Sequence, residues 1–175
     1  MDTDKLVFLD EAGVSLALSY NYGWAPPGVV PVIERPARGN NITLIGAIGL
    51  GGVRALRRVE KSVDGVEFLA FLREDLIPVL EPGTTVIMDG PRLHRMPAVA
   101  ELLEAADCSV LYLPAYSPEL NPIEMAWAWV KKKLRAIAAR KVRALRESIE
   151  KAWNTITPEL CTGWTRHCGY PTQST

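Results

Sequence analysis

Short apolar runs near the start of the chain predict three strands. Lys5–Leu9 (KLVFL) is apolar without strict alternation, which is typical of a strand covered on both faces, and it leads directly into Asp10. Ile42–Leu50 is a second such run, and Gly51-Gly52 supplies a turn into a third at Val53–Val59. We therefore expect an antiparallel meander with a carboxylate at the end of its first strand.

The spacing of apolar residues becomes helical after Asp64. Apolar side chains recur there at three- and four-residue steps until Pro82-Gly83, which ends the pattern. The positions expected to face the core are Val66, Leu69, Leu72, Leu76 and Val79 or Leu80. This segment predicts a helix that connects the meander to the second half of the chain.

Two more strands and a short helix follow. Thr84–Met88 (TTVIM) is a β-branched run that ends in Asp89, so a second carboxylate also comes directly after a strand. Pro97–Ala106 predicts a short helix and Ser109–Leu113 a further strand. A turn-rich loop then runs from Pro114 to Pro122.

The last third of the chain is expected to be helical. Asn121 is a good N-cap and Pro122 suits the first helical position; the apolar stripe that follows is Ile123, Trp127, Val130, Leu134 and Ile137. A final helix is expected at about Arg143–Thr155, and the residues after Pro158 give weak signals. The order of elements predicts an α/β protein with a mixed five-stranded sheet flanked by helices.

Length and composition fit one folded domain. At 175 residues and 48% hydrophobic content, the chain can bury a single well-packed core. We expect a domain at residues 1–157 and a C-terminal tail at 158–175. No apolar run approaches the roughly 18 residues that cross a bilayer, and the first residues lack the features of a signal peptide. The expectation is a cytoplasmic protein without membrane contact.

The net charge of zero conceals a basic segment. Between Asn121 and Lys151 there are nine Lys or Arg residues against three Glu. On a helical projection, Lys131 and Arg135 fall on the same flank as Glu124. A basic run is often only a solvated helix face, but this placement favours contact between phosphates and Lys131, Lys132 and Arg135.

Three carboxylates are candidate metal ligands. Asp10 and Asp89 at the ends of neighbouring strands, with Glu124 on the first turn of a helix, would place oxygen ligands around one cleft. Mg²⁺ and Mn²⁺ prefer such ligands, and two ions about 3.5 to 4 Å apart stabilise both the attacking and leaving oxygens of phosphoryl displacement. Structural alternatives remain for each residue: a strand-end Asp often bonds its own backbone, and Asn121 to Glu124 has the spacing of a capping box.

Several motifs carry a resemblance to a known family. The motifs are Phe8-Leu9-Asp10-Glu11-Ala12-Gly13, Val86-Ile87-Met88-Asp89-Gly90 with His94 following, and Leu113-Pro114-Ala115-Tyr116-Ser117-Pro118-Glu119-Leu120-Asn121-Pro122-Ile123-Glu124. In these motifs the chain resembles the mariner-like transposases and the related bacterial insertion-sequence transposases, which are DDE superfamily endonucleases with a ribonuclease H-like fold.

The resemblance implies a catalytic triad of Asp10, Asp89 and Glu124. In this family about 34 residues separate the second Asp from the Glu, and residues 90–123 number 34 here. The implied cofactor is a pair of Mg²⁺ ions, for which Mn²⁺ can substitute. The first Asp would bridge both ions, and the other two carboxylates would each bind one.

Further residues are expected to contact DNA. His94 lies five residues past Asp89, where it could touch the scissile phosphate or support the metal site, and Arg92 and Arg95 flank it. One departure from the family is Gly90, where Asn is common. The other is the lack of room before Leu6 for the N-terminal helix-turn-helix region that recognises transposon ends in relatives. End recognition is therefore expected from a separate subunit or a fused N-terminal part.

The implied function is cleavage at transposon ends followed by strand transfer into target DNA. We expect a homo-oligomer in the DNA complex, associated with the nucleoid when bound. One rival is another ribonuclease H-like nuclease, which the Pro114 to Glu124 run disfavours. The other is a non-catalytic DNA-binding or assembly module left by a decayed transposase.

Overall fold

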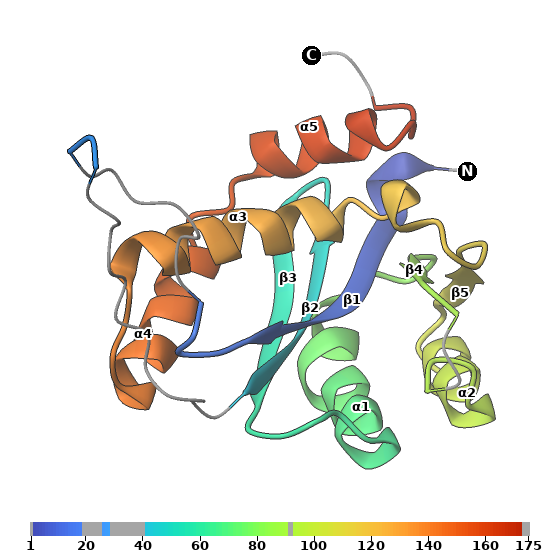
Figure 1. Ribbon diagram of the computed structural model, residues 1–175. Coiled ribbons are helices and arrows are strands. Elements are labelled where there is room, and N and C mark those ends of the chain that lie inside the picture. Colours follow the sequence, from blue (N-terminus) through green and yellow to red (C-terminus); the bar gives the residue numbers. More distant parts are fainter. Residues whose placement is uncertain (1, 19–25, 29–40, 91–92, 173–175) are drawn as a thin grey trace.

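The computed structural model describes residues 2–18, 26–28, 41–90 and 93–172, and its centre is a five-stranded sheet. The strands lie in the order β3-β2-β1-β4-β5 (Figure 1). Their bounds are Leu6–Val14 for β1, Ile42–Gly49 for β2, Gly52–Val59 for β3, Thr85–Met88 for β4 and Ser109–Tyr112 for β5. The first three strands pair antiparallel, whereas β4 pairs parallel with both β1 and β5. The predicted mixed five-stranded sheet is therefore confirmed.

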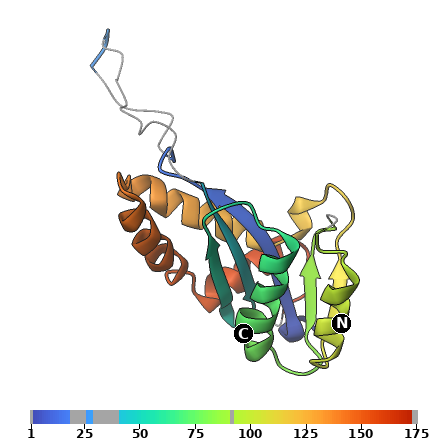
Figure 2. The same cartoon turned by 90° about the horizontal axis from the view of Figure 1, so that it is seen from below.

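Helices cover both faces of this sheet. One face carries α1 (Gly65–Phe71) and α2 (Pro97–Glu104); the other carries α3 (Ile123–Ile137), α4 (Val142–Trp153) and α5 (Pro158–His167) (Figures 1 and 2). Alternate residues of β1 serve the two cores, with Phe8 packing toward α3 and Leu9 toward α1. Among the described helices, none has the length and apolar character to span a bilayer.

The helix after Asp64 forms as predicted, and part of its expected core face is buried. Leu72 and Leu76 are fully buried as expected, together with Phe68 and Phe71. Two other residues expected in the core are exposed: Val66 is 79% exposed and Val79 is 46% exposed. A π-helical turn at 72–76 and a 3₁₀ turn at 77–79 follow α1, so a uniform period of 3.6 does not hold beyond Phe71.

Helix α3 confirms the predicted apolar stripe over most of its length. Ile123, Trp127, Val130 and Leu134 are all buried against the sheet. Ile137, the last predicted member, is 50% exposed because the helix ends there, with Ala138 in the left-handed conformation at φ 48°.

Residues 158–175, expected to form a tail, contain helix α5. The side chain of Thr157 caps it by accepting from the backbone N–H of Leu160 at 3.4 Å, and Pro158 occupies the first turn. Cys161 on this helix is fully buried in the same core as α3 and α4. The Thr157-Pro158 pair is the local signal for the start of this helix.

Gly46 tests the packing beneath α3. A Cβ atom at this position of β2 would lie 2.5 Å from the Trp127 ring and 2.8 Å from the Trp153 ring. We predict that Gly46→Ala lowers the free energy of unfolding by about 1 to 3 kcal/mol, because two packed indoles must move. Gly13→Ala is the matched control, since a Cβ atom there meets nothing within 4 Å. Urea denaturation measures both; equal stability of the two variants would contradict this packing.

Candidate active site

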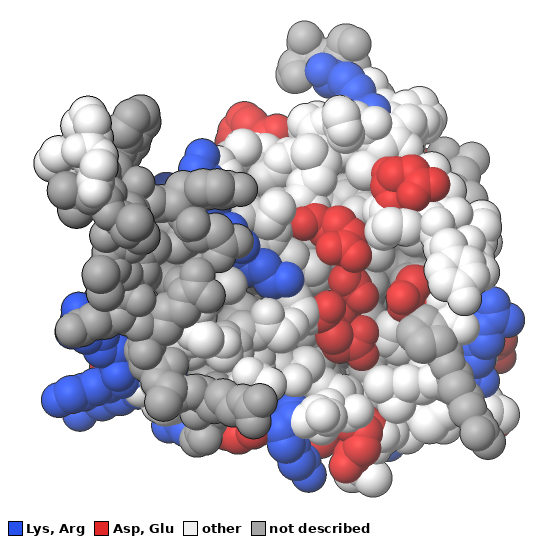
Figure 3. Space-filling model, viewed as in Figure 1, with Lys and Arg blue, Asp and Glu red and all other residues white. Residues whose placement is uncertain are grey.

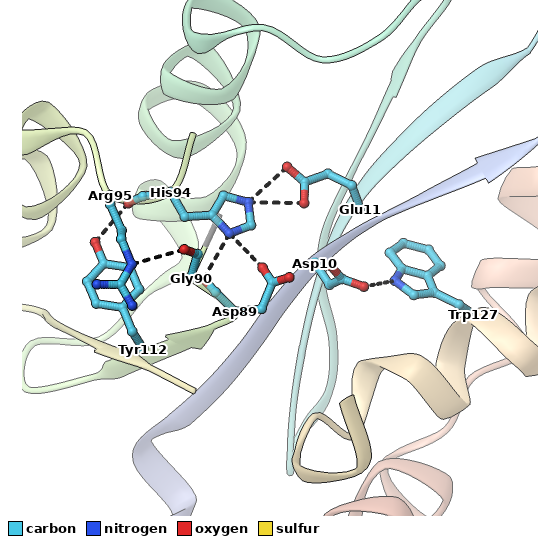
Figure 4. Close-up of polar contacts among 8 residues, drawn as sticks. All are labelled: Asp10, Glu11, Asp89, Gly90, His94, Arg95, Tyr112 and Trp127. Atoms are coloured by element: carbon cyan, nitrogen blue, oxygen red, sulfur yellow. Dashed lines mark hydrogen bonds and ion pairs between the residues drawn. The ribbon is translucent and has the colours of Figure 1, made fainter. Parts of the chain in front are cut away.

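Asp10 lies within β1 and faces the layer that contains α3. The indole Nε1 of Trp127 donates a hydrogen bond to Asp10 Oδ2 at 3.2 Å (Figure 4). Gly46 is the cross-strand partner of Asp10, so the absence of a side chain there leaves room for the Trp127 ring to reach the carboxylate. One Asp10 oxygen is thereby fixed by the core.

The expected position of Asp10 at a strand end is wrong, because β1 continues to Val14. The strand is extended by its antiparallel pairing with β2, in which Asp10 lies opposite Gly46. The parallel pairing of β1 with β4, however, stops at Phe8 and Ile87. Asp89 follows the last residue of β4, so the two Asp residues come together just beyond the end of the parallel ladder.

Glu124 is exposed on the first turn of α3. The capping-box interpretation is not borne out, since no side chain caps this helix and the buried Oδ1 of Asn121 has no hydrogen-bond partner within the described residues. Asn121 is also not the N-cap, a position that Pro122 occupies. The Glu124 carboxylate has no hydrogen bond or ion pair with the described part of the chain, which leaves it free for a ligand.

All three carboxylates line one cleft of about 460 Å³. Gly90, Arg95 and the loop 113–118 complete its wall. Figure 3 shows acidic side chains gathered on the face where α3 crosses the sheet, with Lys and Arg side chains beside them. The cleft therefore combines hard oxygen donors, one cation and an apolar loop.

The three cleft carboxylates are not arranged as a single closed metal cage. Among the residues that the structure describes, no group of three His, Cys, Asp or Glu side chains is placed to hold one metal ion. Asp10 is adjacent in space to both Asp89 and Glu124, and each adds to its negative environment. Two ions that share Asp10 would need only one further carboxylate each, which this arrangement offers.

Burial and neighbouring charge act together on Asp10. Burial is the largest cause that raises the pKa of Asp10 to about 7; the backbone N–H of Glu11 opposes it, and the carboxylates of Glu124, Glu11 and Asp89 add to it. A site that concentrates negative charge in this way disfavours its own ionisation. Bound cations would remove that repulsion, so the donor set fits divalent metal ions.

The His94 ring is completely buried, so the structure offers it no exposed surface for the predicted contact with DNA. Its Nδ1 lies 2.8 Å from Asp89 Oδ1, and its Nε2 lies 3.0 Å from Glu11 Oε1 (Figure 4). The ring stacks on Phe68 with 4.6 Å between the centroids. Burial alone would lower the pKa of His94, but its pairs with Asp89 and Glu11 outweigh that effect and raise the pKa to about 10. The imidazole is therefore a cation that links two carboxylates.

Arg95 reaches the cleft from beside Gly90. Its Nε donates to the Gly90 carbonyl oxygen at 3.0 Å, and its guanidinium lies 5.1 Å from the centre of the Tyr112 ring. A Cβ atom at position 90 would lie 2.6 Å from the Arg95 Nη2. The glycine therefore makes room for the guanidinium. Arg92, the other predicted arginine, lies outside the described residues.

The basic residues of α3 lie on two different sides of the helix. Lys131 and Arg135 are half-buried and Lys132 is exposed. Lys133 instead lies 4.9 Å from the centre of the Trp129 ring. Trp129 packs toward Trp164 of α5 and donates to the hydroxyl of Thr155, so its ring is held within the helical layer.

Sequence reasoning missed the roles of Glu11, Tyr112 and the Trp127 indole N–H. The hydroxyl of Tyr112 donates to the His94 carbonyl oxygen at 2.8 Å. Trp127 was expected only as a core residue. Strand alternation after Asp10 is a signal that could have placed Glu11 on the opposite face of the sheet. Its partner, His94, could not be found in this way, because it lies 83 residues away in the sequence.

Comparison with known proteins places the chain among transposase relatives. It is 23% identical over 165 residues to the Tcb1 transposase of Caenorhabditis briggsae, covering 86% of this chain and 60% of that protein. The Mos1 transposase in a paired-end complex with the left transposon end shares the fold at a TM-score of 0.73 and 19% identity, covering 95% of this chain and 52% of the other.

A second structure, the Mos1 mariner paired-end complex with Mn, has a TM-score of 0.68 and 18% identity, over 94% of this chain and 51% of the other. The chain thus spans between about half and two thirds of the length of these relatives. These matches confirm the predicted ribonuclease H-like fold. The family model for the DDE superfamily endonuclease matches residues 5–146. The chain therefore belongs to the DDE superfamily of endonucleases.

Proposed function

We propose that this chain is the catalytic domain of a cut-and-paste DNA transposase, and that Asp10, Asp89 and Glu124 hold two divalent metal ions. The observation that carries the proposal is their meeting in one cleft, although they come from β1, the end of β4 and the start of α3. Similarity to the Tcb1 and Mos1 transposases supports the same conclusion. No observation favours the alternative of a decayed, non-catalytic module.

Mg²⁺ is the proposed ion, with Mn²⁺ as a substitute. Asp10 would be shared between the two ions, while Asp89 and Glu124 would each bind one. When bound, such ions activate a nucleophile and stabilise the leaving oxygen at phosphorus. The similar Mos1 complexes with Mn and with Mg support this choice of metal.

The residues of this chain would orient the carboxylate ligands and supply positive charge for a phosphate. Trp127 holds one oxygen of Asp10, which leaves the other for a ligand. Arg95, anchored on Gly90 and Tyr112, is placed to hold a phosphate at the mouth of the cleft. The reaction would cut one strand at a transposon end and then join the freed 3′-hydroxyl to target DNA. Both displacements occur at phosphorus and need no covalent bond to the protein.

DNA would approach along the flank of α3 that carries Glu124. Lys131, Lys132 and Arg135 would contact its phosphates, together with Arg95 and Arg92. Such contacts fix the position of the duplex without reading its sequence. Recognition of the ends would come from a further subunit or another part of the protein, and the active form would be a homo-oligomer on chromosomal DNA, as the paired-end complexes of Mos1 suggest.

Asp89→Asn tests the metal site. We predict loss of calorimetric Mn²⁺ binding and a drop of about 10³-fold or more in Mn²⁺-dependent plasmid nicking, since metal stabilisation of the reacting oxygens contributes several kcal/mol. Asp107→Asn is the matched control: Asp107 is exposed and has a φ of 57°, which asparagine adopts readily. This control should bind and nick like the wild type.

Two results would contradict the metal-site proposal. The first is a wild-type protein that binds no Mn²⁺ at millimolar concentration. The second is DNA binding that ignores divalent metal and survives Asp89→Asn, together with no metal-dependent nicking by the wild type. The second pattern is the one expected of a non-catalytic module.

The double substitution Lys131→Gln and Arg135→Gln tests the DNA path. We predict weaker plasmid binding and a shallower dependence of log Kd on log salt, by about 0.9 for each phosphate that the variant no longer neutralises. Mn²⁺ affinity should not change. Lys133→Gln is the control, because Lys133 lies against Trp129 on another side of the helix. If the control weakens binding as much as the double substitution, DNA does not follow this flank.

A further inference from the structure

A fourth carboxylate is held behind the proposed metal site. Glu11 follows Asp10 in β1, so strand alternation directs it to the opposite face of the sheet. Its side chain is only 19% exposed, and both of its carboxylate oxygens lie 3.0 Å from His94 Nε2. Glu11 does not line the cleft that Asp10, Asp89 and Glu124 share. Its partner is the buried imidazole.

His94 connects this carboxylate to Asp89. The opposite ring nitrogen, Nδ1, lies 2.8 Å from Asp89 Oδ1 and 3.1 Å from the Asp89 carbonyl oxygen (Figure 4). Phe68 stacks on the ring, and Tyr112 binds the His94 carbonyl oxygen. The imidazole is therefore fixed on both edges and on one face. Its Nδ1 contacts both the backbone carbonyl oxygen and the side chain of Asp89.

The sheet gives the Asp89 side chain little support of its own. Asp89 follows the last residue of β4, so no ladder hydrogen bond extends to it, and its side chain is 51% exposed. His94 is its only side-chain partner within the described residues. Without that partner the carboxylate would rotate among several rotamers and would lose rotational entropy on binding a cation.

Glu11 keeps the His94 ring in the orientation that its contact with Asp89 requires. A carboxylate that accepts a hydrogen bond from one ring nitrogen fixes the plane of the ring and therefore the direction of the other nitrogen, in the way that outer carboxylates orient metal-binding histidines. Here the imidazole stands one step further from the metal, because it binds Asp89 instead of an ion.

We propose that Glu11 is a positioning residue, which acts through His94 to hold Asp89 in the orientation that binds metal. The proposal rests on the proposed role of Asp89 as a metal ligand. It assigns Glu11 no contact with DNA or with the ions. The expected consequence of removing the Glu11 carboxylate is weaker metal binding in a protein that still folds.

The test is Glu11→Gln, which preserves size but removes the charge. Calorimetric titration with MnCl₂ in the absence of DNA should show an affinity about 10- to 100-fold lower than in the wild type. Glu101→Gln removes an exposed carboxylate on α2 and should leave the affinity unchanged. Nicking by Glu11→Gln should recover as MnCl₂ is raised, because the three cleft carboxylates are intact.

The ring signals of His94 give a second readout that does not need activity. The chain has only two histidines, His94 and His167, so a His167→Gln variant identifies the His94 signals in a nuclear magnetic resonance spectrum. Adding MgCl₂ should shift them, and in Glu11→Gln the shift should need about 10- to 100-fold more MgCl₂. A purely structural role for Glu11 would change the melting temperature without moving this midpoint.

The outcomes separate this proposal from the one on which it rests. A wild-type protein that binds neither MnCl₂ nor MgCl₂ refutes the metal site itself. A wild-type protein that binds, with a folded Glu11→Gln variant whose affinity is within twofold of it, overturns only the role of Glu11. If circular dichroism shows that Glu11→Gln is unfolded, Glu11→Asp replaces it. The shorter carboxylate cannot reach His94 in the same way, so an unchanged affinity in that variant also overturns the role.

Discussion

The site depends on the alternation of side chains along β1. Two consecutive acids, Asp10 and Glu11, point to opposite faces of the sheet, and each meets a donor from a different helical layer. The indole of Trp127 comes from α3 on one side, and the imidazole of His94 comes from the segment beside α1 on the other. Neither layer alone could hold the site. The cleft and the contacts behind it are therefore assembled only when both faces of the sheet are packed.

This arrangement explains why small residues occur beside large ones near the cleft. Gly46 lies under the rings of Trp127 and Trp153, and Gly90 lies under the guanidinium of Arg95. In both places a side chain that carries a polar group to the site passes over a residue without a Cβ atom. At both positions, the close packing over a glycine also sets the direction of the polar group.

The cleft concentrates negative charge. Several carboxylates approach one another where water is partly excluded, and burial together with these neighbours raises the pKa of Asp10. The buried imidazolium of His94 neutralises part of this charge from behind. The remaining negative charge faces the open side, where cations could bind. Cations bound there would relieve the repulsion that contributes to the raised pKa of Asp10.

Local patterns were sufficient for the sheet, most helices and the three acids of the cleft, because runs of apolar residues and the spacing of the motifs are sequence-local features. The exposure of Val79 was not foreseen because π-helical and 3₁₀ turns change the period after α1, and α5 was missed because its apolar residues are few. The link between Glu11 and His94 spans 83 residues, and no local pattern encodes a contact of that range. The burial of His94 follows from its stacking on Phe68, which is likewise a product of the complete fold.

The most direct measurement of the central claim is anomalous X-ray scattering from crystals of this protein soaked in MnCl₂. The account predicts manganese peaks within the cleft, one between Asp10 and Asp89 and one between Asp10 and Glu124. Manganese bound elsewhere on the protein with none in the cleft would contradict it, as would crystals that take up no manganese at millimolar concentration.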